Sequence, residues 1–344
     1  MKCPFRPPYK ILVLPTMFEV IRLSFCSKRF PSDLQGERSS LNRVNQWRQA
    51  RARNSAFSDP NKLNKIRFLL NSSVTLLKGS LQDETSLIKA VKQVDIVICA
   101  VSSNQVFDQK LLIPAIKQAG CIKRFFPSEF GADPDRTQVS HLDNNFYSRK
   151  AEIRRIIEAE GIPHTYTCCN FFMSVLLPSL VQPGRRTPPT DKAIVFGDGN
   201  VKGVFVKESD VAAFTISAVD DPRTLNKTIY LRPPGNVHSL NELIEIWEIK
   251  IGKNLERIYI TEEEILKKIQ ENPYPYNWEL IFIYSVFVKG DHTYFDIDSS
   301  GGLEGTQLYP HIKYTTISEY LDTLLLLAVD NVLNWIPALK NFPL

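Results

Sequence analysis

Short apolar runs alternate with amphipathic segments over much of the first half of the chain. Apolar runs of about four to eight residues are typical of buried strands. They cover residues 10–15, 73–78, 94–101, 121–127 and 164–171. The amphipathic segments predict helices over residues 60–70, 83–92, 108–119 and 146–160. No clean period is visible over residues 17–52, where we expect loop and helix.

This alternation of strand and helix predicts βαβ crossovers, and hence a parallel sheet with helices on both faces. The expected fold class is α/β, a doubly wound parallel sheet of Rossmann-like type. Ligands of such folds bind beyond the carboxyl ends of the strands. The candidate residues at those ends are Ser102, Phe126, Ser128 and Asn170.

The composition changes after Phe172. Pro183, Pro188 and Pro189 interrupt the pattern, and mixed helices and short strands follow. We therefore expect a cofactor-binding domain over residues 1–172, a smaller α+β substrate domain over 173–321, and a C-terminal extension over 322–344. The leucine-rich stretch from Leu321 onward suits a packed helix better than a membrane span, because acidic residues interrupt it.

Composition excludes several classes of function. The formal charge of +5 is mild and no nucleic-acid motif is present, so we expect no nucleic-acid partner. The six cysteines form no CxxC pair, and no His/Cys cluster has metal-ligand spacing, so we expect no metal. Unpaired cysteines within apolar runs indicate a reducing compartment, the cytoplasm.

Several motifs together are similar to one known family. They include Ile122-Lys-Arg-Phe-Phe-Pro-Ser-Glu-Phe-Gly131, Lys150-Ala-Glu-Ile-Arg-Arg155 and Phe196-Gly-Asp-Gly-Asn200. These segments resemble the isoflavone reductase-like family, which includes the phenylcoumaran benzylic ether reductases. Its members are atypical short-chain dehydrogenases/reductases with an NmrA-like fold. The resemblance implies an NADPH-dependent reductase of phenylpropanoid-derived substrates, namely benzylic ethers, lignans or isoflavonoids.

The resemblance also assigns roles to residues. Lys150 matches the catalytic lysine, a general acid/base that exchanges a proton with a small aromatic substrate while NADPH supplies the hydride. Arg53 and Lys62 match basic contacts to the 2′-phosphate of NADPH, a group that arginine can bind with two hydrogen bonds. Further cofactor-side positions are Ser102, Phe126, Ser128, Arg154 and Asn170. Tyr284 falls in the substrate pocket, where relatives usually carry histidine.

The N-terminal region departs from the family pattern. The family has a glycine-rich loop after the first strand, whereas Pro15-Thr-Met-Phe18 follows the strand here. Glycines allow the backbone to approach the diphosphate, and proline has no N–H to donate. Either residues 15–52 are a misread exon, or the protein is a variant that binds NADPH weakly or not at all.

Three functions therefore remain open from sequence. The first is the reductase, with a homodimer as a possible assembly. The second is a dinucleotide-sensing regulator of NmrA-like type, which has no need of a proton-transfer group such as Lys150. The third is an inactive paralogue that has lost the cofactor loop.

Overall fold

The structure describes residues 9–15, 19–24 and 74–335 of the 344. In this computed structural model the chain divides into two compact units. The first unit comprises residues 1–128 and 156–163, and the second comprises residues 129–155 and 164–344. The predicted helix at 60–70, Arg53 and Lys62 lie outside the described residues. The predicted division into domains at residue 172 stays a prediction.

The first unit is built on a five-stranded sheet with the order β3-β2-β1-β4-β5. Its strands are β1 (Lys10–Pro15), β2 (Glu19–Ser24), β3 (Val74–Lys78), β4 (Ile96–Ala100) and β5 (Arg124–Phe126). β1 pairs in parallel with β4, and β4 pairs in parallel with β5. β4 is buried over almost its whole length, as its continuous apolar run predicts.

The second strand of this sheet corrects one expectation from the sequence. Residues 19–24, expected within loop and helix, form β2, which pairs antiparallel with both β1 and β3. β1 ends at Pro15 and β2 begins at Glu19. A connection this short permits only an antiparallel return, because a parallel neighbour needs a crossover of about a dozen residues.

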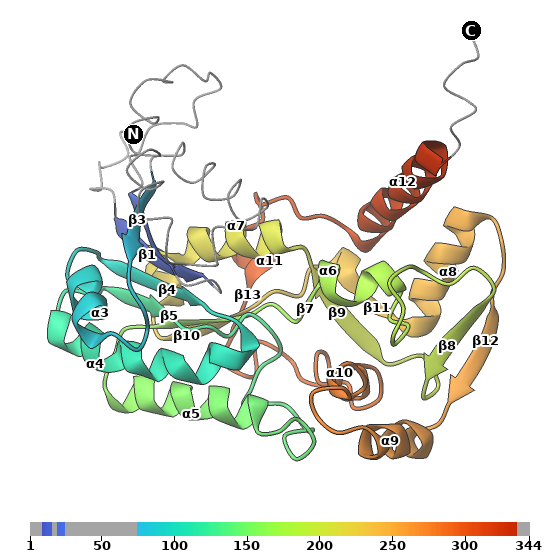
Figure 1. Cartoon of the computed structure of the whole chain (residues 1–344), viewed down its shortest axis with the longest axis horizontal. Coiled ribbons are helices and arrows are strands. Elements are labelled where there is room, and N and C mark those ends of the chain that lie inside the picture. Colours follow the sequence, from blue (N-terminus) through green and yellow to red (C-terminus); the bar gives the residue numbers. More distant parts are fainter. Residues whose placement is uncertain (1–8, 16–18, 25–73, 336–344) are drawn as a thin grey trace, which may run out of the picture. The chain divides into compact units, whose positions relative to one another are not determined.

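Two helices (Figure 1) and one 3₁₀ segment follow strands β3 and β4 in the first unit. They are α3 (Glu84–Val91), η3 (Ser103–Leu111) and α4 (Leu112–Ala119). The Asp83 side chain caps α3 by accepting from Ser86 N, and Gly120 ends α4 with a left-handed φ of 64°. The predicted helix start at 108 was four residues early. Pro114 cannot donate to a carbonyl four residues back, so it suits only the first turn of a helix.

The second unit contains three small sheets, with the orders β13-β10-β6, β11-β9-β7 and β12-β8. Their strands are β6 (Thr165–Cys168), β7 (Phe171–Phe172), β8 (Lys192–Phe196), β9 (Lys202–Val206), β10 (Lys227–Tyr230), β11 (Val237–Ser239), β12 (Glu256–Ile260) and β13 (Leu303–Glu304). The pairs β6–β10, β10–β13 and β8–β12 are parallel. The strand predicted over residues 164–171 corresponds to β6, which is shorter at both ends.

Helices carry most of the apolar core of the second unit. They are α5 (Phe146–Ala159), α6 (Met173–Leu176), α7 (Glu208–Ala218), α8 (Leu240–Ile251), α9 (Glu262–Glu271), α10 (Trp278–Phe287), α11 (Gly305–Leu308) and α12 (Ile317–Trp335), with short turns η4 (Leu177–Ser179), η5 (Pro222–Thr224) and η6 (Pro234–Asn236). The boundary between the units falls within α5. Both α8 and α9 begin with a capping box, formed by Ser239 with Glu242 and by Thr261 with Glu264.

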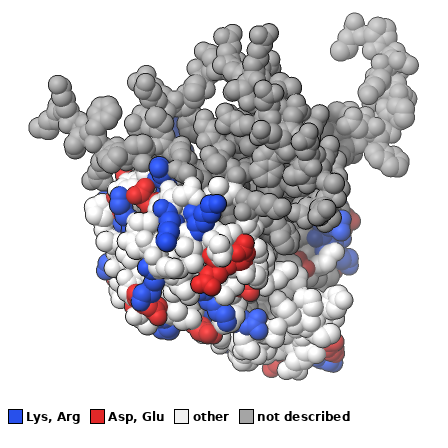
Figure 2. All heavy atoms as spheres, turned by 60° about the vertical axis from the view of Figure 1, so that its left-hand side comes forward, with Lys and Arg blue, Asp and Glu red and all other residues white. Residues whose placement is uncertain are grey.

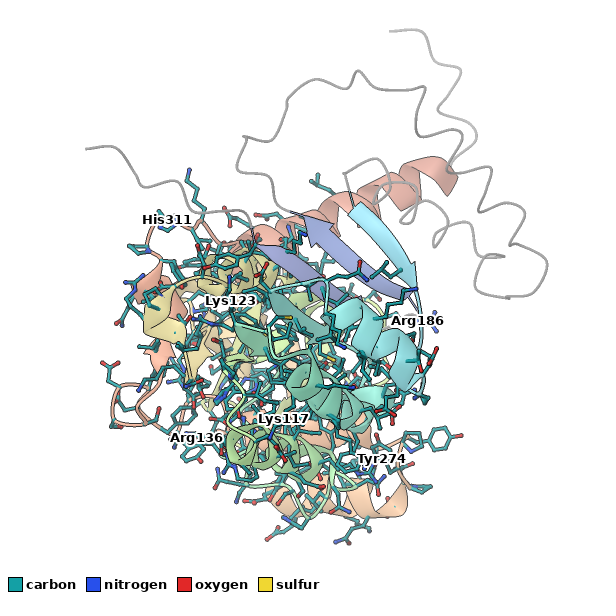
Figure 3. All side chains as sticks on the ribbon, turned by 90° about the vertical axis from the view of Figure 1, so that its left-hand side faces the viewer. Lys117, Lys123, Arg136, Arg186, Tyr274 and His311 are labelled. Atoms are coloured by element: carbon teal, nitrogen blue, oxygen red, sulfur yellow. The ribbon has the colours of Figure 1, made fainter. Side chains whose placement is uncertain are left out.

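The face of the molecule drawn in Figure 2 is mixed in charge. On the face in Figure 2, lysine and arginine side chains are interspersed with acidic ones rather than gathered in one patch. Figure 3 shows Tyr274 pointing outward, and this side chain is exposed. Within the described part of the chain, no helix combines the length and the apolar character needed to cross a membrane.

Candidate active site

Lys150 lies in the second turn of α5 and is buried, with 6% of its surface exposed. Asp143 stabilises the start of this helix by accepting a hydrogen bond from the Tyr147 N–H. The Lys150 Nζ donates to the main-chain oxygen of Glu129 at 2.6 Å. It also lies 4.6 Å from the centre of the Phe146 ring. The amine therefore has a neutral acceptor on one side and an aromatic face on the other.

Burial determines the electrostatics of this amine. It lowers the pKa of Lys150, and the charge of Arg154 lowers it further, whereas the Glu129 carboxylate opposes the shift. Cys168 and Cys169 also face the amine. Burial raises the pKa of both thiols, that of Cys169 to about 12, so they stay neutral at ordinary pH. A lysine with a lowered pKa is better matched to proton transfer near neutrality than an exposed lysine.

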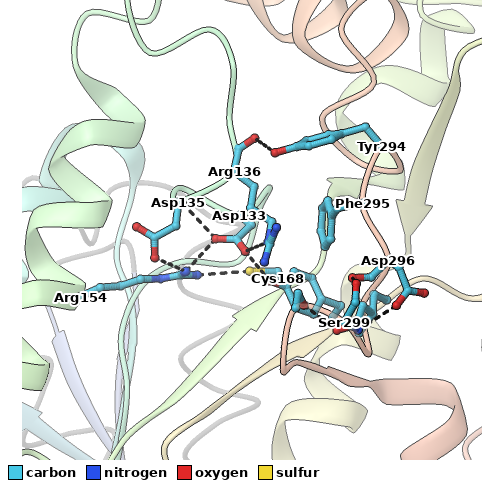
Figure 4. A network of polar contacts seen from close by, with 12 residues as sticks. Asp133, Asp135, Arg136, Arg154, Cys168, Tyr294, Phe295, Asp296 and Ser299 are labelled. Carbon is cyan, nitrogen blue, oxygen red and sulfur yellow. Dashed lines mark hydrogen bonds and ion pairs between the residues drawn. The ribbon is translucent and has the colours of Figure 1, made fainter.

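Arg154, one helical turn after Lys150, lies among carboxylates. Its Nε donates to Glu129 Oε1 at 2.6 Å, and its Nη1 donates to Asp133 at 2.7 Å and Asp135 at 2.9 Å. Figure 4 shows Arg154 reaching Asp133, Asp135 and the Cys168 sulfur. Although burial acts against its charge, the Glu129 carboxylate raises the pKa of Arg154, so Arg154 remains a cation.

The segment that follows β5 is held from a second side. The Tyr230 hydroxyl donates to Asp133, and the Tyr294 hydroxyl donates to the Arg136 main-chain oxygen at 2.7 Å. The Arg136 guanidinium lies over the Phe295 ring at 4.5 Å (Figure 4). Residues 129–136 are therefore anchored both to α5 and to the 294–295 segment, which fixes the carbonyl that binds Lys150.

Asn170 is brought to the same segment. It follows β6 with a left-handed φ of 61°, a conformation that asparagine tolerates better than most residues. Its main-chain N–H donates to the Gly131 oxygen at 3.0 Å, and its side-chain Nδ2 donates to the Leu231 oxygen at 2.9 Å. Lys150 and Arg154, one turn apart on α5, and Asn170, just after β6, therefore all bind residues 129–133.

Other predicted cofactor positions belong to the first unit. Phe126 is fully buried in β5. Ser128 is buried; its N–H donates to Gln109 Oε1 at 2.7 Å and its hydroxyl donates to the Val101 oxygen at 3.0 Å. Ser102 precedes η3, and its hydroxyl donates to Gln105 Oε1 at 3.3 Å. The cofactor roles of these residues stay predictions.

Tyr284, predicted to line the substrate pocket, is buried in α10. Its hydroxyl donates to Glu262 Oε1 at 2.8 Å. Burial and this hydrogen bond raise the pKa of Tyr284 to about 12. The hydroxyl therefore stays protonated, and its proton is already donated to Glu262. The predicted substrate role of Tyr284 stays a prediction.

The end of β1 is the position where a Rossmann-like fold holds a diphosphate. Residues 9–15 and 19–24 form a strand and its antiparallel return. Among the described residues, neither a glycine-rich turn nor a helix N-terminus follows β1, so these residues do not fit a diphosphate. The described residues also contain no group of three or more His, Cys, Asp or Glu side chains placed to hold a metal ion.

Sequence reasoning did not assign a role to Glu129, Gly131 or Asp133. Glu129 and Gly131 lie within the quoted Ile122–Gly131 motif, which was the available signal. The hydrogen bonds from Lys150 to Glu129 and from Arg154 to Asp133 span about twenty residues of chain, and spacing alone cannot reveal such contacts.

Comparison with known proteins shows what the chain as a whole is similar to. The sequence model described as the NmrA-like family matches residues 46–321. A probable pinoresinol-lariciresinol reductase of Arabidopsis thaliana is 64% identical over 273 residues, which cover 79% of this chain and 88% of the relative. A phenylcoumaran benzylic ether reductase of Betula pendula is 54% identical over 272 residues, again 79% and 88% of the two chains.

The chain is also similar in structure to solved proteins. The leucoanthocyanidin reductase–NADPH binary complex from Vitis vinifera superposes with a TM-score of 0.72 at 36% identity. The alignment covers 78% of this chain and 88% of that one. The Rossmann-like, NmrA-like fold class predicted from sequence is therefore confirmed.

Proposed function

The chain belongs to the NmrA-like family, and from that premise we propose that it is an NADPH-dependent reductase of aromatic, phenylpropanoid-derived substrates. The observation that carries the proposal is the buried amine of Lys150, hydrogen-bonded to one main-chain oxygen and packed on Phe146. Relatives at 64% and 54% identity bear the names of reductases of a lignan and of a benzylic ether. The substrate class proposed here spans benzylic ethers, lignans and isoflavonoids.

The described residues support one chemical role for this site. Lys150 Nζ holds or releases the proton that a phenol or carbonyl oxygen of the substrate exchanges. The Glu129 oxygen fixes the direction of the amine, and Gly131 leaves space beside it. The Phe146 ring, held edge-on against Phe282 at 6.0 Å, excludes water from one side. Fixed orientation of this kind is often the larger part of a rate enhancement.

NADPH is the cofactor in this proposal, and it would supply the hydride when bound. A similar leucoanthocyanidin reductase is solved as a binary complex with NADPH. The described residues after β1 do not fit the diphosphate, so a cradle for it would have to include residues outside the described ranges. Arg53 and Lys62, proposed to bind the 2′-phosphate, are among those residues.

Two measurements test the proposal. Titration with NADPH, followed by nicotinamide fluorescence, measures binding, and oxidation of NADPH in the presence of a dilignol measures turnover. We expect Lys150→Met to lower kcat by about 10²- to 10⁴-fold while NADPH still binds. Lys89→Met, at an exposed lysine of α3, is the matched control and should leave turnover unchanged. Full turnover in Lys150→Met would refute the proposed role of this lysine.

An inactive paralogue is the second candidate, and the antiparallel return of the chain after β1 is the observation that favours it. It requires that NADPH does not bind to the purified protein. Binding without turnover of any dilignol or isoflavonoid would instead favour a dinucleotide-sensing regulator.

The proposal also covers the cellular compartment and the oligomeric state. Cys99, Cys121, Cys168 and Cys169 are free thiols, which suits the reducing cytoplasm. Assembly as a homodimer remains a prediction, and sedimentation velocity of the purified protein would test it.

A further inference from the structure

Helix α5 holds Glu129 at two points. Lys150 binds the main-chain oxygen of Glu129, and Arg154, one turn further along the helix, binds its side chain. All three residues belong to the second unit. Glu129 therefore offers its neutral main-chain oxygen to Lys150 and its charged carboxylate to Arg154.

The arginine occupies both carboxylate oxygens of Glu129. Its Nε donates to Oε1 at 2.6 Å and its Nη2 donates to Oε2 at 2.5 Å. Such a bidentate pair fixes the plane of the carboxylate as well as its position. The other arm of the guanidinium is fixed in turn, because Nη1 is bound by Asp133 and Asp135. Both the Glu129 and the Arg154 side chains are 3% exposed, so water offers no substitute partner.

Without Arg154, the Glu129 carboxylate would pair with the Lys150 ammonium group. It is carried by the residue whose carbonyl already touches the Lys150 amine. An ammonium group is the natural partner for a buried, uncompensated carboxylate. An ion pair between Glu129 and Lys150 would hold the lysine as a cation and occupy its N–H groups.

We infer that Arg154 is a positioning residue: by binding both oxygens of the Glu129 carboxylate, it keeps that charge from Lys150 and leaves the amine free to exchange a proton with the substrate. This inference rests on the proposed function of Lys150. It also gives Arg154 a role different from the cofactor contact predicted from sequence.

The groups that face Lys150 set the direction of each expected change. They are Glu129 from the segment after β5, Arg154 from α5 itself, and Cys168 and Cys169 from β6 and its end. Burial lowers the pKa of Lys150, Arg154 adds to this, and Glu129 opposes it. Loss of Arg154 should therefore raise the pKa of Lys150, and loss of the Glu129 charge should lower it.

The test is a pH titration of Lys150 by NMR in the full-length protein labelled with ¹³C at the lysine ε-carbons, with the Lys150 signal identified by its loss in Lys150→Arg. We expect the midpoint to move to higher pH in Arg154→Met and to lower pH in Glu129→Gln. The double variant should lie nearer the wild type than Arg154→Met does. Arg155→Met, at the exposed neighbour that binds Asp135, is the control and should leave the midpoint in place.

Each outcome bears on the inference directly. Unchanged midpoints in both Arg154→Met and Glu129→Gln would overturn it. If Arg154→Met does not fold, because it leaves buried carboxylates unpaired, Glu129→Gln alone decides, and an unchanged or raised midpoint overturns the inference. The titration needs neither NADPH nor substrate. Its failure is therefore distinct from failure of the reductase proposal, which turnover by Lys150→Met decides.

Discussion

Gly131 borders the Lys150 amine so closely that a single methyl group would reach it. A Cβ built on Gly131 lies 3.7 Å from Lys150 Nζ and 3.6 Å from the Glu129 oxygen. Both distances are ordinary van der Waals contacts, and the backbone of Gly131 does not need a left-handed φ. The backbone at position 131 does not require glycine. The absence of a side chain there instead leaves space beside the Lys150 amine.

Gly131→Ala should separate stability from activity. We expect the melting temperature to stay equal or to rise slightly, because alanine at a compatible φ stabilises by about 0.4–1 kcal/mol through the unfolded chain. We expect kcat/KM to fall by about tenfold or more, because the methyl group fills the space in which a substrate oxygen must approach Nζ. Thermal unfolding and steady-state kinetics on one preparation measure both effects.

Gly235→Ala is the matched control for this variant. Its Cβ would meet Thr316 at 3.4 Å and Tyr314 rather than Lys150. It should leave kcat/KM near the wild-type value. Unchanged kinetics in Gly131→Ala would show that the substrate does not approach the amine from this side.

Asn170 combines a left-handed backbone with a buried side-chain hydrogen bond, and two substitutions separate these contributions. Asn170→Gly keeps the φ of 61° accessible and loses only the bond to the Leu231 oxygen. It should lower the free energy of unfolding by about 1–2 kcal/mol. Asn170→Ala should cost about 1 kcal/mol more, because alanine is strained at that φ. Urea unfolding measures both.

The same pair of variants tests the predicted cofactor role of Asn170. If the side chain binds NADPH, both variants weaken NADPH binding equally once folding is complete. If Asn170 acts only through its main-chain bond to the Gly131 oxygen, Asn170→Gly should bind NADPH like the wild type. Nicotinamide fluorescence distinguishes the two results.

The sequence predicted those parts of the fold that depend on local pattern. Continuous apolar runs predicted β1 and β4, and the helix end predicted at residue 119 matches the end of α4. The antiparallel β2 was missed because its partner strands, not its own residues, determine its direction. The apolar helix α10 was missed because its residues are hydrophobic all round, which gives no helical period.

The candidate site was predictable only where a motif marked it. Lys150 stood out through its motif, and Asn170 through its place at the end of an apolar run. The carboxylates around Arg154 could not be predicted, because Glu129, Asp133 and Asp135 reach it through the folded path of the chain. From sequence Arg154 was a cofactor-side position, and the structure adds that its guanidinium donates to the carboxylates of Glu129, Asp133 and Asp135.

Tyr284→Phe should affect stability more than substrate binding. The lost hydroxyl removes the hydrogen bond to the Glu262 carboxylate, worth about 0.5–1.5 kcal/mol. That hydrogen bond also lowers the pKa of Glu262 below its usual 4.5. The stabilisation is therefore present above pH 4.5 and is lost as the pH falls through the lowered pKa. Urea unfolding at pH 7 and pH 3.5 should show the difference between the two proteins shrinking at the lower pH.

The kinetic half of this prediction uses a second variant. KM should be unchanged in Tyr284→Phe, because the hydroxyl is already bound to Glu262. Tyr284→Leu removes the ring as well and should raise KM if the ring borders the substrate, as predicted from sequence. A raised KM in Tyr284→Phe would contradict the assignment of the hydroxyl to Glu262.

His292 should make the protein sensitive to mild acid. Burial, together with the charge of Arg232, lowers the pKa of His292 to about 3, and its Nδ1 accepts a hydrogen bond from the Val204 N–H. In the unfolded chain the histidine takes up a proton near its ordinary pKa of 6.5. Between pH 6.5 and about 3 the unfolded state thus binds more protons, so stability is full above pH 6.5 and falls below it, by up to about 1.4 kcal/mol per pH unit.

His292→Asn, whose side-chain oxygen can still accept from Val204, should lose this slope in urea unfolding between pH 7 and 5, whereas His141→Asn at an exposed histidine should keep it. Parallel curves for the wild type and His292→Asn would mean that His292 is protonated in the folded protein.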